Sequence, residues 1–490
     1  MDFTTLPDSL GHLLTYHREA PLIFSSGLFW VLFVCFMPLY ALLRQRKWQM
    51  FVFVIAFSLY FYYKCSGWFF LLLVSTSVID WFISRAMVEI GSSAGRKWLV
   101  ALSVVISLSV LGFFKYANFF LWNWNAMVEG NFQPLTLILP VGISFYTFQS
   151  ISYIVDVYRR KIAPAETWGE YLFFLSFFPA LVAGPIVRAE NFLPQLRENR
   201  RADHSEVYGG LWLILSGVIK KAVIADYIAQ YNDLIFASPT GYSGFESLMG
   251  VIGYTMQIYC DFSGYSDMAI GLALIMGFRL DINFNLPYKS QSLTEFWRRW
   301  HISLSTWLRD YVYIPLGGNR HGTFRTYLNN FLTMLIGGLW HGAAWKFIFW
   351  GGMHGIGLII NKLCRPFTSR FDGKTWFSIL AGFITVIYVS LLWVFFRADS
   401  FTDSILIIKN IFCNFSPQCI LPFIEFRSLW VVLMALIIIA HYLPEQWHDR
   451  AAGIFIRAPW IIKLLVFLIV VQLVIEFSGE DIAPFIYFQF

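Results

Sequence analysis

Long runs of apolar residues, separated by short polar or basic segments, dominate the chain from Phe24 almost to its end. A membrane-spanning α-helix needs roughly 20 mainly apolar residues. This pattern predicts spans over residues 22–43, 48–64, 68–84, 98–120, 134–153, 208–231, 246–277, 327–342, 346–361, 376–396, 427–443 and 460–477. The sequence shows no strand-like alternation of apolar and polar residues. We therefore predict an all-α, polytopic membrane protein with about 11–13 membrane helices.

Two further apolar stretches, residues 168–187 and 297–316, are interrupted by Pro, Gly or Arg and are predicted to be re-entrant or interfacial helices. The adjacent segments 327–342 and 346–361 are together too short for two full crossings. They predict a hairpin of half-length helices with its turn near residues 342–346, deep in the membrane. Lys220 and Lys221 are expected to mark the end of a helix.

The composition agrees with a membrane protein, since 58% of the residues are hydrophobic and only 13% are charged. Basic residues gather in alternate loops, which the positive-inside rule places in the cytoplasm. Both chain termini are then predicted to lie outside, and the main partner of the surface is membrane lipid. The net charge of +6 is explained by this topology, so it does not indicate nucleic-acid binding.

The six cysteines show no CxxC pair and no Cys/His spacing typical of a metal site, so no metal is predicted. Cys413 and Cys419 flank the sequence NFSPQ in a segment that is expected to lie outside. A disulfide could form between them there. Two unpaired thiols are the alternative, and the sequence leaves both open.

The candidate chemistry lies between residues 295 and 341, where two histidines and several arginines occur in or against the membrane. Ionisable side chains kept at membrane depth usually line a cavity or a reaction site. The pKa of histidine suits a proton acceptor near neutral pH, which makes His301 and His341 candidate catalytic residues. Alternatively, either histidine could simply form a hydrogen bond to a neighbouring helix. Asp261, within a predicted span, either lines a cavity or forms a structural hydrogen bond.

Six sequence segments together resemble the membrane-bound O-acyltransferase family. They are LPVGISFYTFQSISYIVDVYRR (139–160), FFPALVAGPIVR (177–188), QIYCDFSGYSDMAIG (257–271), NFNLPYKSQSLTEFWRRWHISLSTWLRDYVYIPLGGNR (283–320), GGLWHGAAW (337–345) and WVFFRADSF (393–401). Within the family they are most similar to the alginate O-acetylase (AlgI-like) branch. The resemblance covers roughly residues 22–490, and residues 283–345 form its core motif region.

The resemblance implies the family fold around a central tunnel and a location in the bacterial inner membrane. It implies transfer of an acetyl group from cytoplasmic acetyl-CoA toward an extracytoplasmic polysaccharide, through a separate extracytoplasmic acyltransferase as partner. His341 matches the histidine that is almost universal in the family, and His301 matches a second polar position. Trp340, Ser303 and Asp261 are candidate tunnel-lining residues. Transfer of another acyl group such as D-alanyl, or transport of a polysaccharide precursor without acyl chemistry, are the alternatives.

Three arginines, Arg298, Arg299 and Arg309, are expected on the cytoplasmic side beside aromatic residues. Guanidinium groups pair well with phosphate, so they are candidates for holding the phosphates of coenzyme A. They could equally anchor a short helix at lipid headgroups.

Residues 1–21 are interpreted as an N-terminal extension, 22–478 as the transmembrane domain and 479–490 as an aromatic, extracytoplasmic tail. In acyltransferase systems of the type that the chain resembles, a terminal tyrosine could carry the acyl group, which makes Tyr487 a candidate carrier. The alternative is an interfacial aromatic anchor.

Overall fold

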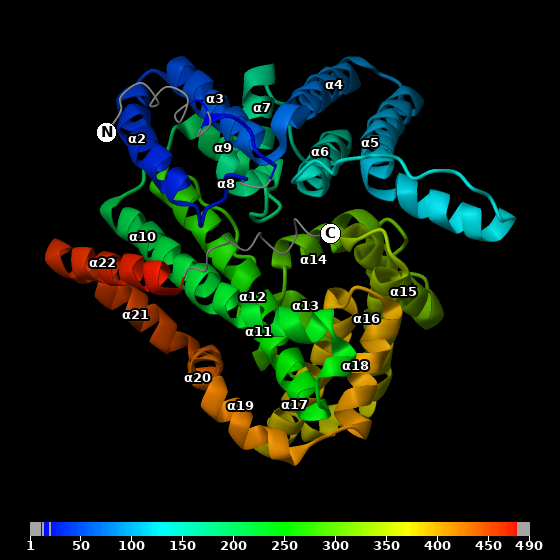
Figure 1. Ribbon diagram of the computed structural model, residues 1–490. Helices are drawn as coiled ribbons and strands as arrows, with labels where there is room; N and C mark the ends of the chain where they lie inside the picture. Colours follow the sequence, from blue (N-terminus) through cyan, green and yellow to red (C-terminus); the bar gives the residue numbers. More distant parts are fainter. Residues whose placement is uncertain (1–10, 12–13, 19–20, 478–490) are drawn as a thin grey trace. The chain divides into compact units, whose positions relative to one another are not determined.

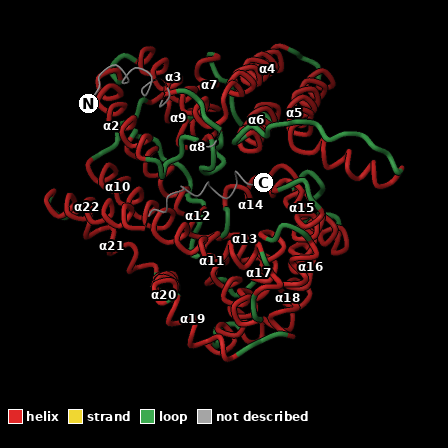
Figure 2. Tube along the Cα trace, viewed as in Figure 1, coloured by secondary structure: helices red, strands yellow, loops and turns green. Residues whose placement is uncertain are grey.

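The computed structural model describes residue 11, residues 14–18 and residues 21–477. In these residues the backbone forms helices, turns and loops without a strand (Figure 2), which confirms the all-α prediction. Most of the predicted extension, and the whole of the predicted tail with Tyr487, lie outside the described residues.

The chain divides into two compact units. One contains the residues up to Val207 together with Leu272–Leu280, and the other contains Tyr208–Gly271 and the chain from Asp281 on. The segment 22–478, interpreted from the sequence as one domain, is thus distributed over both.

The first unit is built from helices that bury aromatic side chains. They are α2 (Gly27–Leu43), α3 (Lys47–Ser66), α4 (Phe70–Glu89), α5 (Ser93–Val128), α6 (Ile143–Tyr158), α7 (Trp168–Ser176), α8 (Phe178–Leu181) and α9 (Ala189–Glu198), as labelled in Figure 1. Phe178 packs against Phe36 and Phe57, with ring centroids 5.6 and 5.0 Å apart. Offset and edge-on ring packing of this kind stabilises a core beyond the buried area.

Helix α6 begins nine residues later than the span predicted over 134–153, which is a correction to that boundary. Pro134 and Pro140 lack the backbone N–H that a helix uses, and Gly142 has a left-handed φ of 73°. The apolar stretch before residue 143 is therefore loop, since its conformation is incompatible with a helix.

The second unit carries the candidate chemistry. Its helices are α10 (His204–Val218, which begins in the first unit), α11 (Asp226–Ala237), α12 (Gly244–Ile275), α13 (Leu293–Arg299), α14 (Ile302–Leu308), α15 (Gly322–His341), α16 (Trp345–Thr368), α17 (Thr375–Arg397), α18 (Phe401–Cys413), α19 (Ile420–Phe426), α20 (Ser428–Tyr442), α21 (Glu445–Arg457) and α22 (Trp460–Phe477). The two stretches predicted as re-entrant or interfacial helices contain only short helices. Residues 168–187 contain α7 and α8, and residues 297–316 contain the end of α13, the whole of α14 and a π-helical turn, Arg309–Tyr313.

Helices α10 and α11 are joined by a π-helical turn, Ile219–Ala225, so that one helical segment runs from His204 to Ala237. The expectation that Lys220 and Lys221 mark a helix end is therefore wrong. Both side chains form ion pairs instead, which removes the cost of continuing the helix past two positive charges.

Six helical segments of the described chain are long and apolar enough to cross a membrane, or eight if each of two sharply bent helix pairs counts as one. Helices α2 and α6, with 17 and 16 residues, are shorter than a span of 18 residues. The length and composition of the six long segments support a multi-pass membrane protein.

Candidate functional site

His341 is the last residue of α15, at the turn into α16 (Figure 1). Its side chain is only 4% exposed. The ring contacts Trp340, Trp350 and Phe396, with centroid separations of 4.9, 5.1 and 5.2 Å. These contacts place the imidazole in an aromatic pocket formed by three helices, α15, α16 and α17.

The close packing of α15 on α16 depends on glycine. A Cβ atom at Gly338 would lie 2.3 Å from the Phe347 carbonyl oxygen and 2.9 Å from Gly351 Cα. Small residues at such crossings let two helix backbones approach closely. The GG pairs of both helices therefore determine where the end of α15, and with it His341, lies.

The predicted hairpin is present, but the prediction of half-length helices is wrong. Helix α15 has 20 residues and α16 has 24. At about 1.5 Å per residue, the shorter one is roughly 30 Å long, enough to cross a bilayer. The predicted span began at residue 327 because the first turn of α15, around Arg325, is polar. This turn is still helical, since polar side chains at a membrane surface are solvated.

His301 lies between α13 and α14 and is fully buried. Its ring meets Phe262 edge-on, with centroids 4.7 Å apart, and its centroid is 6.1 Å from that of Trp340. Since Trp340 also contacts His341, the same indole is a neighbour of both histidines. Two residues 40 positions apart in the sequence are thus brought into one site.

The backbone at His301 is unusual, because its φ of 43° and ψ of 57° fall in the left-handed region. Non-glycine residues adopt this conformation only when their surroundings compensate the cost, and such positions are frequent at functional sites. This conformation ends α13 and starts α14 in a new direction, with the imidazole directed into the protein.

Asn283 contacts His301 through a hydrogen bond to its Nδ1 atom. The Asn283 side chain is 1% exposed. Its Oδ1 accepts hydrogen bonds from the Ser303 backbone N–H (3.2 Å) and from Ser303 Oγ (2.9 Å). It also lies 3.1 Å from His301 Nδ1, and Asn283 Nδ2 donates to Ser266 Oγ at 3.2 Å.

This network fixes the tautomer of His301. A backbone N–H can only donate, so the atom that accepts from Ser303 must be the amide oxygen of Asn283. An amide oxygen cannot donate, so His301 Nδ1 must carry the proton in the hydrogen bond between them. Nε2 is then the basic nitrogen of this ring.

Burial also sets the charge of His301, which lies outside the candidate membrane spans. Removal from water disfavours the imidazolium form and lowers the pKa of His301 to about 3. The ring is therefore neutral at physiological pH. A group with so low a pKa is a better hydrogen-bond acceptor than proton acceptor.

The tunnel-lining candidates differ in their surroundings. Trp340 and Ser303 are both buried beside the histidines. Asp261 is not in a comparable position, because its carboxylate forms a 2.5 Å ion pair with Lys221, which is itself 2.7 Å from Asp226. A structural role, one of the two alternatives for Asp261, accounts for these contacts.

The three candidate arginines are placed in distinct environments. Arg299 pairs with Glu295 at 2.9 Å and with Glu445 at 3.3 Å, so two carboxylates of the protein already compensate its positive charge. Arg309 is exposed and pairs with Asp310 at 2.8 Å. Arg298 is exposed at the end of α13.

Sequence reasoning missed Asn283 as a member of the site. It opens the longest segment of the family resemblance, NFNLPYK, but its spacing from His301 did not indicate contact. A polar residue directly before an apolar turn was the available signal. Cys413 and Cys419, for which a disulfide was one of two alternatives, are both free thiols.

Taken together, the fold and the buried histidines define a helical membrane protein with a candidate site for acid–base chemistry. A family model described as "MBOAT, membrane-bound O-acyltransferase family" matches residues 167–400. The chain is 38% identical over 498 residues to the "Probable alginate O-acetylase AlgI" of Pseudomonas putida, with 96% of this chain and 100% of the relative covered. The chain belongs to the membrane-bound O-acyltransferase family, and it is an acyltransferase.

Two further relatives have names that indicate other acceptors and, in one of them, another acyl group. The "Peptidoglycan O-acetyltransferase" of Helicobacter pylori is 37% identical over 431 residues, covering 82% of each chain. The "Teichoic acid D-alanyltransferase" of Bacillus subtilis is 28% identical over 296 residues, covering 57% of this chain and 74% of the relative. Similarity is thus higher and more extensive to the two acetyl-transferring relatives.

Proposed function

We propose that this protein transfers an acetyl group from cytoplasmic acetyl-CoA toward hydroxyl groups of an extracytoplasmic polysaccharide, with a separate extracytoplasmic acyltransferase as partner. The observation that carries the proposal is the pair of buried histidines around Trp340, within the segments shared with the family. The names of the relatives support acetyl over D-alanyl, because the acetyl-transferring relatives align over more of the chain. Family membership favours an enzyme over a transporter.

In the proposed reaction the His341 imidazole takes the proton of the attacking hydroxyl. The hydroxyl oxygen then forms a bond to the thioester carbonyl carbon, and the carbon–sulfur bond breaks. The imidazolium returns its proton to the sulfur of coenzyme A, so that the base is regenerated. His301, held by Asn283 with Nε2 as acceptor, would position the acceptor molecule by accepting a hydrogen bond from a second hydroxyl group, because the proton of the attacking hydroxyl passes to His341.

Arg298 and Arg309 are the proposed contacts for the phosphates of coenzyme A, because both side chains are exposed. Arg299 is less suited, since two glutamates already pair with it. The orientation predicted from the basic loops places these arginines in the cytoplasm and both termini outside, in the inner membrane of a bacterium. The tunnel through which donor and acceptor approach His341 is part of the same proposal.

The decisive test uses membranes that contain this protein and its extracytoplasmic partner. Radiolabel from acetyl-CoA should pass to polysaccharide, and His341→Ala should abolish this transfer while inserting normally. His354→Met is the matched control, because His354 is a buried histidine of the same hairpin whose ring nitrogens make no hydrogen bond among the described residues. Full transfer by His341→Ala would reject the proposed base.

Tyr487 is proposed as an intermediate acyl carrier, although it lies outside the described residues. Replacing Tyr487 with Phe removes only the hydroxyl oxygen that would bear the acetyl ester. Polysaccharide acetylation should then fall to background, whereas an interfacial anchor would be preserved by Phe. Unchanged acetylation in the same membrane assay would exclude the carrier role.

A further inference from the structure

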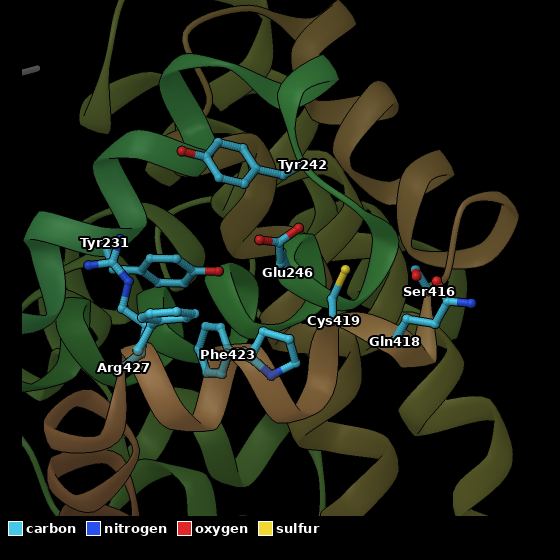
Figure 3. Close-up of a pocket in the computed structure, with 10 residues that line it drawn as sticks. Tyr231, Tyr242, Glu246, Ser416, Gln418, Cys419, Phe423 and Arg427 are labelled. Carbon is cyan, nitrogen blue, oxygen red and sulfur yellow. The ribbon is translucent and has the colours of Figure 1, made fainter.

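A second candidate site lies away from the two histidines, in the second unit. A cavity of about 340 Å³ opens between α11, the start of α12 and the segment 416–427 (Figure 3). It is lined by Tyr231, Tyr242, Glu246, Ser416, Gln418, Cys419, Pro422, Phe423, Phe426 and Arg427. Ligand pockets typically have volumes of roughly 300–1,000 Å³ and combine apolar walls with a few polar groups. The cavity fits this description at its lower limit.

Tyr231 is the feature that points to a ligand. The residue is 4% exposed, and its hydroxyl has no hydrogen-bond partner among the described residues. Figure 3 shows this hydroxyl directed into the cavity. A buried tyrosine hydroxyl normally finds a partner, because leaving it unpaired costs free energy. The missing partner is therefore expected to come from a bound molecule.

The ring of Tyr231 is held firmly enough to aim this hydroxyl. Phe423 and Trp430 meet it edge-on, with centroids 5.2 and 5.7 Å away. The guanidinium of Arg427 lies 5.0 Å from the ring centroid. Three neighbours thus fix the ring, and the hydroxyl cannot turn away to find another partner.

Glu246 supplies the second polar group. Its Oε2 accepts hydrogen bonds from the backbone N–H of Ser243 (3.0 Å) and from Ser243 Oγ (2.8 Å), which caps the start of α12. This arrangement fixes the carboxylate, which lines the same cavity as Tyr231 (Figure 3). The Glu246 carboxylate and the Arg427 guanidinium carry opposite charges, so the charges of these two lining residues cancel.

We propose that this cavity binds one neutral sugar ring of a glycan. Aromatic side chains can pack by dispersion against the apolar C–H face of a pyranose. The carboxylate accepts hydrogen bonds from sugar hydroxyls, while the Tyr231 hydroxyl, Ser416 and Gln418 can donate or accept. Because the charges of Glu246 and Arg427 cancel, the cavity offers no net positive charge to compensate the desolvation of a uronate carboxylate, whereas a neutral ring needs none.

Contacts within the second unit connect this cavity to the His341 turn. Asp233, half a helical turn from Tyr231, pairs with Arg397 at the end of α17. Lys346, in the first turn of α16, donates to the carbonyl of Ala398 at 2.6 Å. Both links lie at the end of α17 where α15 turns into α16. The basic segment 362–374 before α17 is predicted to lie in the cytoplasm, so the other end of α17 is predicted to lie outside. A glycan acceptor would arrive on that side.

The choice of a glycan among hydroxyl-rich ligands rests on the proposed function. Binding is therefore measured without any acyl donor, on the purified full-length protein in detergent micelles, by saturation-transfer NMR. Maltotriose and N,N′,N″-triacetylchitotriose are the neutral probes, and a guluronate trimer is the charged one. The wild type should bind at least one neutral probe saturably and should bind the guluronate trimer more weakly.

Tyr231→Phe removes only the unpaired hydroxyl. It should weaken binding of the neutral probe about fivefold or more, as expected for one lost hydrogen bond, and leave thermal stability unchanged or higher. Tyr254→Phe is the matched control, because Tyr254 is a buried tyrosine of α12 whose hydroxyl also has no partner among the described residues, but it does not line the cavity. Its affinity should equal that of the wild type.

Saturable binding that Tyr231→Phe leaves intact, or the absence of saturable binding to both neutral probes, would overturn the inference. If the wild type transfers acetyl but binds neither probe, the sugar site is wrong and the proposed function stands. If binding depends on Tyr231 but no acetyl transfer occurs with a competent partner, the sugar site stands and the proposed function fails.

Discussion

Replacing Asn283 with Ala tests whether the orientation of His301 matters for the reaction. The substitution removes the acceptor of three hydrogen bonds, from His301 Nδ1, Ser303 N and Ser303 Oγ. The Ser303 hydroxyl can rotate to another partner and the His301 imidazole can move its proton to Nε2, whereas the Ser303 backbone N–H is fixed in place. Because Asn283 is 1% exposed, this N–H would lose its Asn283 acceptor in a buried environment, and the tautomer of His301 would no longer be fixed.

The expected cost is large in stability and in rate. A buried donor that loses its partner costs about 1–3 kcal/mol, which is the expected loss of unfolding free energy. Misplacement of a group that positions a reactant, even by about 1 Å, can lower the rate about 100-fold. Acetyl transfer should fall by that factor, measured per correctly inserted molecule, and the unfolding temperature in detergent should fall as well.

Asn283→Asp separates orientation from stability. A carboxylate keeps the acceptor for His301 but adds negative charge beside the imidazole, which stabilises the imidazolium and raises the pKa of His301 above its buried value of about 3. The ring then becomes protonated at a higher pH, and its Nε2 ceases to be an acceptor. The acidic limb of the pH–rate profile should therefore shift to higher pH.

Ser266→Ala is the control, because it removes the partner of Asn283 Nδ2 without touching the acceptor oxygen. Its transfer rate should stay within a few-fold of the wild type. Wild-type transfer by correctly inserted Asn283→Ala would refute the reasoning. So would an acidic limb of Asn283→Asp that coincides with that of the wild type.

Two further substitutions test the helix packing around the site, both by thermal unfolding of the purified protein in detergent. Gly338→Ala should lower stability by about 1–3 kcal/mol through overpacking, whereas Gly352→Ala, whose Cβ would be 3.6 Å from its nearest neighbour, should not; equal effects would contradict the close crossing. Lys221→Met should cost about 3–5 kcal/mol, because it leaves Asp261 buried without its counter-charge, and adding Asp261→Asn should recover part of the loss. A neutral outcome for Lys221→Met would show that the buried ion pair is unimportant.

Much of the fold follows from the sequence, because apolar length is what a bilayer selects. Helices α16 and α17 begin within one residue of the predicted spans, since a short turn of small residues precedes α16 and a polar loop precedes α17. The apolar pattern failed at positions where proline, glycine or paired charges determine the extent of a helix. Pro140 and Gly142 delay α6, and the polar first turn of α15 extends that helix beyond its apolar part.

The candidate site was only partly accessible to sequence reasoning. His301 and His341 were identified by residue type, and the structure places both against Trp340. Their catalytic roles stay predictions. The contact of Asn283 with His301 could not be read from spacing, because it depends on a left-handed residue at the break between two short helices. The pairing of Lys221 with Asp261 likewise depends on which face of α12 the π-helical turn Ile219–Ala225 meets.

The ion pairs between the π-helical turn and α12 have a consequence for how the protein is made. Lys220 leaves the ribosome well before its counter-ion Asp267, and Lys221 before Asp261. Until α12 is synthesised, the segment His204–Ala237 offers the lipid two cations with a single nearby carboxylate, that of Asp226. We therefore expect these two helices to enter the bilayer from the translocon together, as one hairpin, rather than one after the other.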